Sequence, residues 1–227
     1  MNYYFDLDIT MEIVEWPESE EARNALLDDK GKIICLGPDN CCVADFREWI
    51  LRNRTQSGRS LRISISVQRI CVDDLVLFGE ICLELNLNSC WGHYGGHIGM
   101  AAIGSIPKLN LSGTIMPLKT IDYLTSVIDL NLSLWSDIKD VEPLSRLQNL
   151  ESLDLSYCKN IKDIELLSRL QNLRHLNLTR CKKITDVEPL CRLQNLQSLN
   201  LSHCINVKSF DCLQGLEVTV VLNRIES

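Results

Sequence analysis

The stretch LESLDLSYCKNIKDIELLSRLQN, residues 150–172, decides the fold of this chain. Its apolar residues stand at places 1, 4, 6, 9, 12, 15, 18 and 21 of the 23-residue unit. The next 23 residues, LRHLNLTRCKKITDVEPLCRLQN at 173–195, fill the same eight places with Leu, Ile, Val or Cys. Agreement at all eight places indicates an internal repeat. A period of this length is typical of a solenoid built from stacked units.

The spacing inside one unit predicts its shape. Leu153 and Leu155 are two residues apart, so they point to the same side of a short strand. From Cys158 onward the apolar step is three, which suits a 3₁₀ turn or irregular chain better than an α-helix. Each unit is therefore predicted to be a strand, a corner and a compact return. All three parts face one core, which only stacking can bury.

The repeat extends in both directions from this unit. The predicted units are two degenerate ones, 60–81 and 82–105, followed by 106–126, 127–149, 150–172, 173–195 and 196–215. Residues 216–227 are predicted to supply a closing strand. In residues 1–59, predicted strands and helices alternate: strands are expected at 11–16 and 32–36, and helices at 19–27 and 44–52. They predict a helix-bearing N-terminal cap that continues the solenoid, with a separate small domain as the alternative.

The pattern LxxLxLxxC, continued as IxDVEPLxRLQN, resembles the leucine-rich repeat family over residues 106–215. Its return segment is similar to the short internalin type and to the leucine-rich regulatory subunit of protein phosphatase 1. The cysteine at the ninth place is similar to that of cysteine-containing repeats, including repeat proteins of trypanosomes. The resemblance implies an α/β solenoid with parallel strands on one face and short 3₁₀ or irregular returns. It implies fold more than function, because architecture defines this family.

Composition narrows the functional class. Apolar residues make up 45% and charged residues 23% of the chain, as in ordinary folded proteins. No apolar run reaches the roughly 18 residues of a membrane span. The N-terminus MNYYFDLDIT lacks the basic flank and apolar core of a secretory signal. These features predict an intracellular protein, cytoplasmic or nuclear, without a membrane partner.

Charge and cysteine usage add two further expectations. The net charge is −7, and residues 1–29 alone hold nine acids and one base, which argues against a nucleic-acid partner. The eleven cysteines are odd in number, and a reducing compartment is expected. Five of them occupy repeat places and are predicted to be small buried hydrophobes rather than a disulfide framework. These are Cys82, Cys90, Cys158, Cys181 and Cys204.

The outward places of the unit differ in how much they vary. The fifth and seventh places hold Asn, Asp, Ser or Thr on nearly every unit. They predict structural side chains that face outward and hydrogen-bond along the stack. The third and eighth places change from unit to unit, and their mixture of apolar, aromatic, Arg and His residues is typical of interfaces. The predicted partner-binding residues are Asp129, His175, Leu134, Tyr157, Arg180 and His203. The alternative is drift on a solvated surface.

Enzymatic motifs give little support for catalysis. Cys90, His93 and His97 have ligand-capable side chains, but the ninth place of a unit already claims Cys90 for the core. No CxxC, GxSxG, HExxH or phosphate loop occurs. We therefore predict no metal, no cofactor and no catalysis.

The function predicted from sequence is a non-catalytic scaffold that binds a protein partner through its strand face. The alternatives are a substrate-recognition subunit of a ubiquitin ligase, a phosphatase regulator, or a metal-dependent enzyme using residues 90–97. The identity of the partner and the oligomeric state stay open.

Overall fold

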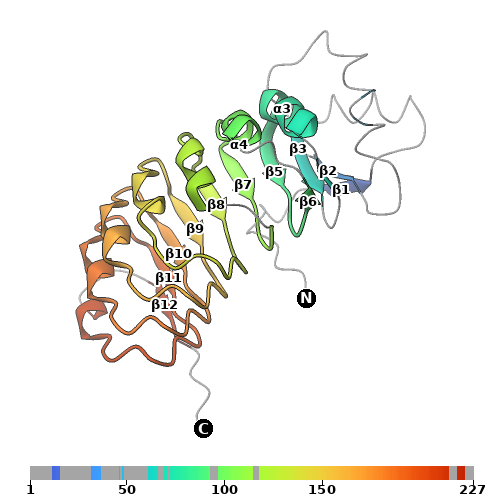
Figure 1. The fold of residues 1–227 in the computed structure, drawn as a ribbon. Coiled ribbons are helices and arrows are strands. Elements are labelled where there is room, and N and C mark those ends of the chain that lie inside the picture. The colour runs from blue at the N-terminus through green and yellow to red at the C-terminus, as the bar shows by residue number, and fades with distance from the viewer. Residues whose placement is uncertain are drawn as a thin grey trace.

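The strands of the solenoid form one open parallel sheet. The computed structural model describes residues 12–15, 32–36, 46, 48, 61–65, 69–70, 72–92, 97–114, 118–214 and 219–222. Ten of its strands lie in the order β1-β2-β3-β5-β7-β8-β9-β10-β11-β12. Neighbours in this order are also neighbours along the chain, so each strand joins the stack beside the one before it (Figure 1). This order confirms the predicted solenoid.

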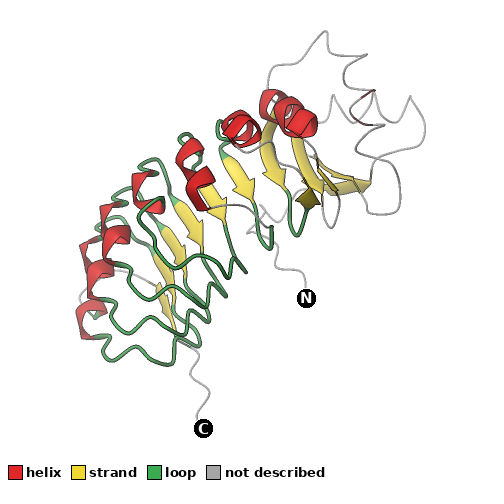
Figure 2. Ribbon diagram, in the orientation of Figure 1, coloured by secondary structure: helices red, strands yellow, loops and turns green. Residues whose placement is uncertain are grey.

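The elements alternate between a strand side and a helix side (Figure 2). The strands of the main sheet are β1 (Glu12–Glu15), β2 (Lys32–Leu36), β3 (Leu61–Ile65), β5 (Cys82–Asn86), β7 (Lys108–Asn110), β8 (Asp129–Asn131), β9 (Ser152–Asp154), β10 (His175–Asn177), β11 (Ser198–Asn200) and β12 (Thr219–Val221). A separate pair consists of β4 (Arg69–Ile70) and β6 (Trp91–Gly92). The returns contain α3 (Val72–Ile81), α4 (His97–Ile103) and the 3₁₀ helices η1 (Leu118–Tyr123), η2 (Leu144–Arg146), η3 (Glu165–Arg169), η4 (Glu188–Arg192) and η5 (Asp211–Leu213).

The 23-residue period is also the register of the sheet. Leu130, Leu153, Leu176 and Leu199 are paired in sequence across β8, β9, β10 and β11. Because equivalent residues face each other, every apolar place of a unit meets the same place of the next. All eight apolar residues of the unit 150–172 are buried, none more than 1% exposed. The core is therefore one continuous column of such residues.

The returns after residue 106 are short 3₁₀ helices, as the apolar step of three predicts. Among the described residues beyond Ile103 there is no α-helix. An aspartate forms a side-chain turn before three of these returns by accepting the backbone N–H two residues on; it stands two residues before η3 and η4 and four before η2. The donors are Glu142, Glu165 and Glu188, and the acceptors are Asp140, Asp163 and Asp186, at 2.8, 2.8 and 2.9 Å.

The N-terminal strands belong to the same sheet as the repeats. The strands expected at 11–16 and 32–36 are β1 and β2, and β2 pairs with β3. The helix expected at 19–27 lies outside the described residues, and of the one at 44–52 only Phe46 and Glu48 are described, both helical. The two degenerate units return through α-helices, α3 and α4. The step-of-three pattern does not extend to these units, so it did not predict the helix α4.

The last described strand is β12, which lies within the segment 216–227 and pairs in parallel with β11. Within the residues that the structure describes, no helix has the length and apolar character needed to cross a bilayer.

Candidate functional site

In the main sheet, each strand from β5 to β11 ends in a turn made by its own last side chain. The fifth-place Asn or Asp accepts the backbone N–H of the seventh-place residue at 2.7–3.0 Å. This is the side-chain turn that Asn and Asp form readily. The acceptors are Asn86, Asn110, Asn131, Asp154, Asn177 and Asn200. The fifth column is thus structural, as predicted, although Asn110 and Asn131 are buried rather than facing outward.

The turn leaves the eighth-place residue in the left-handed region of the backbone. The non-glycine residues of the described chain with positive φ are the five at this place, with φ between 54° and 68°. They are Ser89, Leu134, Tyr157, Arg180 and His203. The unit 106–126 carries Gly113 at this place, with φ 65°. An L-residue in this region costs about 1–2 kcal/mol, whereas glycine does not. Four of the six predicted partner-binding residues therefore stand at strained positions.

Backbone hydrogen bonds hold these residues at strand spacing. The N–H groups of Leu134, Tyr157 and Arg180 donate to the seventh-place carbonyl of the following unit, at 2.9, 2.7 and 2.8 Å. The ladder thus continues past the C-terminal ends of the strands. Since rungs are about 4.8 Å apart, the anchors of Tyr157 and His203 lie only about 10 Å from each other. We call Leu134, Tyr157, Arg180 and His203 the eighth-place column.

Side chains of the column contact one another and reach solvent. The guanidinium carbon of Arg180 lies 5.1 Å from the centroid of the Tyr157 ring, a cation–π contact. Leu134 is 52% exposed although it is apolar. Three units after Leu134, the tenth-place Ile205 is 59% exposed. The structure therefore brings an aromatic, a guanidinium and exposed aliphatic groups together along one edge of the stack.

The two third-place candidates lie apart from this edge. Asp129 begins β8 and pairs with Lys108 at 3.5 Å, which leaves its side chain 20% exposed. His175 begins β10, is exposed, and has Ser152 and Ser198 beside it in register. Five residues separate the third place from the eighth, a reach of at most ~16 Å along the chain. Asp129 and His175 thus lie on the strand face, and the eighth-place column lies beyond its C-terminal margin.

The seventh column does not face outward as expected. Ser112, Ser133, Ser156 and Ser202 are at most 8% exposed. Ser112 Oγ and Ser133 Oγ lie 2.7 Å apart in a hydrogen bond between neighbouring rungs. The tight turn draws these small hydroxyl groups inward, and Ser202 Oγ is buried there without a hydrogen-bond partner among the described residues. Their role is structural, although the predicted direction was wrong.

The ninth place carries a ladder of side-chain donors. The thiols of Cys158, Cys181 and Cys204 each donate to the sixth-place carbonyl of the unit before, at 3.3, 3.1 and 3.0 Å. In the unit 127–149 the indole Nε1 of Trp135 does the same at 2.7 Å. Burial raises the pKa of Cys158 to about 12 and that of Cys204 to about 11, and it raises the pKa of Cys181 as well. These sulfurs are therefore neutral thiols at pH 7, which are poor nucleophiles and poor metal ligands.

The prediction for the cysteines holds for the five at repeat places and is wrong for two others. Cys82, Cys90, Cys158, Cys181 and Cys204 are all buried, as predicted.

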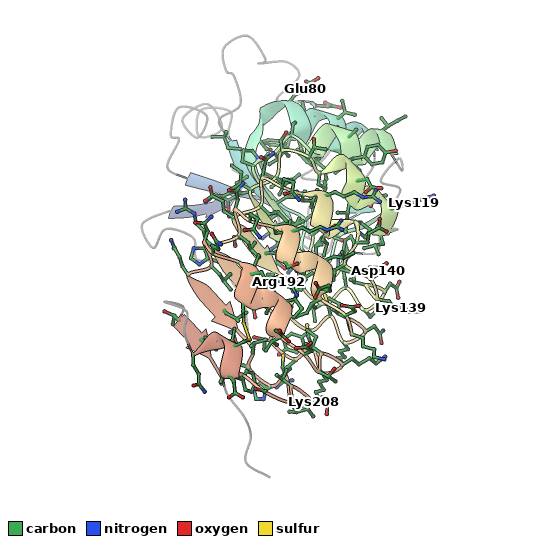
Figure 3. All side chains as sticks on the ribbon, turned by 90° about the vertical axis from the view of Figure 1, so that its left-hand side faces the viewer. Glu80, Lys119, Lys139, Asp140, Arg192 and Lys208 are labelled. Atoms are coloured by element: carbon green, nitrogen blue, oxygen red, sulfur yellow. A yellow bond between two sulfur atoms is a disulfide. The ribbon has the colours of Figure 1, made fainter. Side chains whose placement is uncertain are left out.

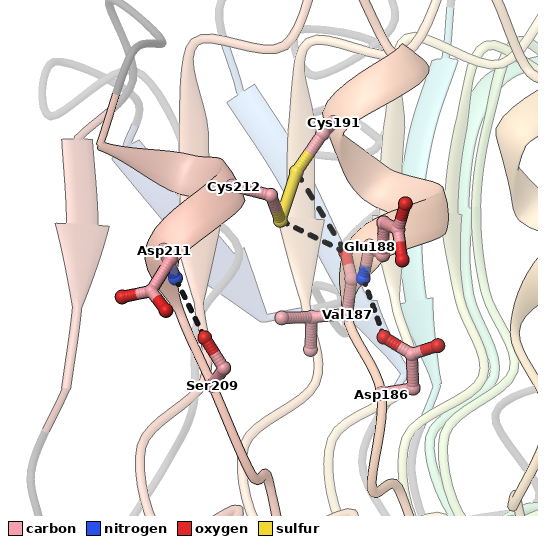
Figure 4. The surroundings of a disulfide bond; sticks show 7 residues. All are labelled: Asp186, Val187, Glu188, Cys191, Ser209, Asp211 and Cys212. Atoms are coloured by element: carbon pink, nitrogen blue, oxygen red, sulfur yellow. Dashed lines mark hydrogen bonds between the residues drawn. A yellow bond between two sulfur atoms is a disulfide. The ribbon is translucent and has the colours of Figure 1, made fainter.

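A disulfide joins Cys191 on η4 to Cys212 on η5, with 6.1 Å between their Cα atoms (Figure 4). The stacking of η4 on η5 brings the two residues together, and the sulfurs lie 4.0 and 3.9 Å from the carbonyl oxygen of Val187. A chain with every cysteine reduced was therefore the wrong expectation.

The candidate metal and catalytic groups do not converge in the described part of the chain. Cys90 is 1% exposed and faces the core, and His93 lies outside the described residues. No group of three His, Cys, Asp or Glu side chains suited to a metal occurs among the residues searched. A hollow of about 230 Å³ between two returns is lined by Lys139, Asp140, Val141, Asp163 and Leu166. Its two carboxylates already cap the backbone N–H groups of Glu142 and Glu165.

Comparison with known proteins supports the architecture. The family model of leucine-rich repeats in two copies matches residues 148–192 and 171–217. No protein with a curated description matches the sequence. Three similar solved structures show TM-scores below 0.5.

The first of these structures is internalin C2 of Listeria monocytogenes, with 24% identity over 67% of this chain and 75% of that one, TM-score 0.49. The second is a complex of TLR13 with ssRNA13, with 17% identity over 76% of this chain and 29% of that one, TM-score 0.47. The third is the leucine-rich repeat domain of the type III effector XopL, with 14% identity over 80% and 82%, TM-score 0.43.

The sequence match covers the units in which period, register and burial are most regular. Those units have the strand, the side-chain turn and the 3₁₀ return in the order that the repeat pattern predicts. Residues 148–217 therefore match the leucine-rich repeat family.

Proposed function

We propose that the chain is a non-catalytic module that binds a protein partner through its strand face and the adjoining eighth-place column. Leucine-rich repeat proteins are generally protein-interaction modules, which supports this class of function. The single observation that carries the choice of surface is the strained backbone of the column. Residues held in sparsely populated backbone regions cluster at functional sites.

The strain is informative because the fold does not require it. Gly113 fills the same place with the same φ, so glycine is compatible with the rung. Four successive units nevertheless carry Leu, Tyr, Arg and His. Each of these side chains costs more backbone energy than glycine would. Tyr and Arg are also the residue types that most often dominate binding energy at interfaces.

The remaining chemistry of the site suits binding better than catalysis. The ninth-place thiols are neutral and donate to backbone carbonyls. The carboxylates of the one hollow described above are engaged as helix caps. No contact among the described residues favours a ubiquitin-ligase or phosphatase partner over another protein. We therefore propose a protein partner and no narrower class.

The experiment is a selection of binders followed by a test of the surface. The purified chain is immobilised, and binders are selected from a displayed library of protein fragments. Affinities are then measured for the double variant Tyr157→Gly/Arg180→Gly and for a matched control, Lys119→Gly/Arg169→Gly, on the return helices. We expect the column variant to weaken binding at least tenfold and the control to leave it unchanged.

Folding and binding separate cleanly in this design. Glycine relieves the backbone strain at the eighth place. The column variant should therefore lose at most ~1 kcal/mol of stability, the size of the lost cation–π contact. A urea titration checks this. Binders that tolerate the column variant as well as the control would show that the interface lies elsewhere.

A further inference from the structure

The charges of the repeat units are distributed unequally between the two sides of the stack. On the return side, arginines form ion pairs with acids. One of these arginines, Arg192, is labelled in Figure 3. Arg146 pairs with Glu142 at 2.6 Å and with Asp122 at 3.0 Å. Arg192 on η4 pairs with Glu165 on the preceding η3. The positive charges of Arg146 and Arg192 are thus compensated within the molecule.

The corner of the last units carries cations without such compensation. We call six residues the basic corner; all are exposed, and none forms an ion pair with any residue that the structure describes. They are Lys159, Lys162, Arg180, Lys182, Lys183 and Lys208. The acids nearest to them along the chain are Asp163, Asp186 and Asp211. Asp163 and Asp186 each use one carboxylate oxygen to accept the N–H of a glutamate two residues on.

Hydrogen bonds between rungs fix the positions of these cations. Lys183 Nζ donates to Asn160 Oδ1 at 2.7 Å, one rung back. The amide of Asn206 donates to the carbonyl of Lys182 at 2.6 Å. The N–H of Lys208 donates to the carbonyl of Thr185 at 3.1 Å. The backbone beneath the basic corner is therefore stacked and rigid over three rungs, about 10 Å.

We propose that the basic corner, together with the Tyr157–Arg180 stack, binds an acidic segment of a protein partner. This mode of binding rests on the proposed function and adds the chemistry of the partner to it. Carboxylates would meet the lysines, and an apolar or aromatic group of the same segment would contact exposed Leu134 or Ile205. Complementary charge of this kind steers association and fixes the register of the complex.

A protein segment fits this surface better than a nucleic acid. The exposed apolar side chains of Leu134 and Ile205, 52% and 59% accessible, lie on the column and its flank, where a sugar–phosphate chain offers them little. Tyr157, the aromatic residue of the column, is already covered by the Arg180 guanidinium and is a poor platform for stacked bases.

The test begins with an unbiased selection from a displayed library of random 16-residue peptides. Enrichment of sequences rich in Asp and Glu that carry an apolar residue supports an acidic partner. Enrichment of neutral or basic sequences that lose affinity in Tyr157→Gly/Arg180→Gly overturns the acidic partner and leaves the proposed function standing. Recovery of no peptide that depends on the column or the corner counts against both.

Charge reversal then tests the corner directly. The probe is a selected acidic peptide, labelled for fluorescence anisotropy, with a 16-nucleotide single-stranded DNA as the competing class. Lys182→Glu/Lys183→Glu should weaken the peptide at least tenfold in 50 mM salt, and 500 mM salt should weaken binding to the unchanged chain. The control Lys119→Glu/Arg169→Glu makes the same change in net charge on the return side. Equal losses in the two variants, or tighter binding of the DNA than of the peptide, would overturn the inference.

Discussion

Raising the pH should unfold this protein through its buried thiols. Cys158, Cys181 and Cys204 have pKa values raised by burial, to about 12 and about 11 for the first and last. In the unfolded chain a thiol titrates near 8.5. A group whose pKa is higher in the folded state adds stability below its unfolded pKa and loses it as the pH rises. The stability from these thiols is thus complete at pH 7 and falls above pH 8.5.

The expected loss is large relative to the stability of a domain. At pH 10 deprotonation favours the unfolded state by about 2 kcal/mol for each thiol. Three thiols together remove about 6 kcal/mol, against the 5–15 kcal/mol that a native domain has in total. The free energy of unfolding is measured by urea titration at pH 7, 8, 9 and 10.

A variant separates the thiols from the other groups that titrate in this range. Cys181→Ala removes one S–H donor to Leu155 and leaves a small cavity, which should cost about 1–2 kcal/mol at pH 7. Its loss between pH 7 and pH 10 should then be smaller than that of the unchanged chain by about 2 kcal/mol. Tyrosines and lysines contribute equally to both proteins. If both lose the same free energy, the ninth-place thiols do not act as the structure indicates.

The remaining predictions concern backbone strain, capping and the disulfide. Leu134→Gly should raise the free energy of unfolding by about 0.5–1 kcal/mol because glycine tolerates positive φ, and a decrease in urea titration would contradict the strain. Asp163→Ala should lower it by about 1 kcal/mol through loss of the cap on η3, whereas Asp163→Asn keeps the acceptor oxygen and most of the stability. Peptide mapping of the unreduced protein should recover Cys191 and Cys212 as one linked pair. Cys191→Ala should cost about 3 kcal/mol, since the disulfide closes a loop of 21 residues.

The sequence predicts the stack well because the residues that recur with the period are the same residues that the fold buries. Leu153, Leu155 and Cys158 recur every 23 residues, and a repeated apolar row can be buried only by stacking in register. The 3₁₀ returns follow from the step of three. The N-terminal strands β1 and β2 were also predictable, because each is an apolar run bounded by charged or glycine-containing stretches.

Other features depend on contacts that the repeat pattern does not contain. The disulfide joins residues 21 apart, off the 23-residue period, so no column of equivalent places includes it. The helix α4 lies in a degenerate unit, where Gly104 allows the closely packed turn that follows. The strained column did leave a signal in the sequence. The eighth place is glycine in one unit, Gly113, and the fifth place is Asn in every unit but one. Together these residues indicate positive φ for the whole eighth column.

The shared register of the rungs also sets how this molecule can change in length. Each interior unit hydrogen-bonds only to the unit before and the unit after it, through identical places. Removal or duplication of a whole unit therefore leaves every other contact intact, whereas a gain of one or two residues inside a strand shifts apolar residues out of the core. Such a chain lengthens in whole steps of about 4.8 Å. Recombination that copies a unit would lengthen the recognition edge while keeping the fold.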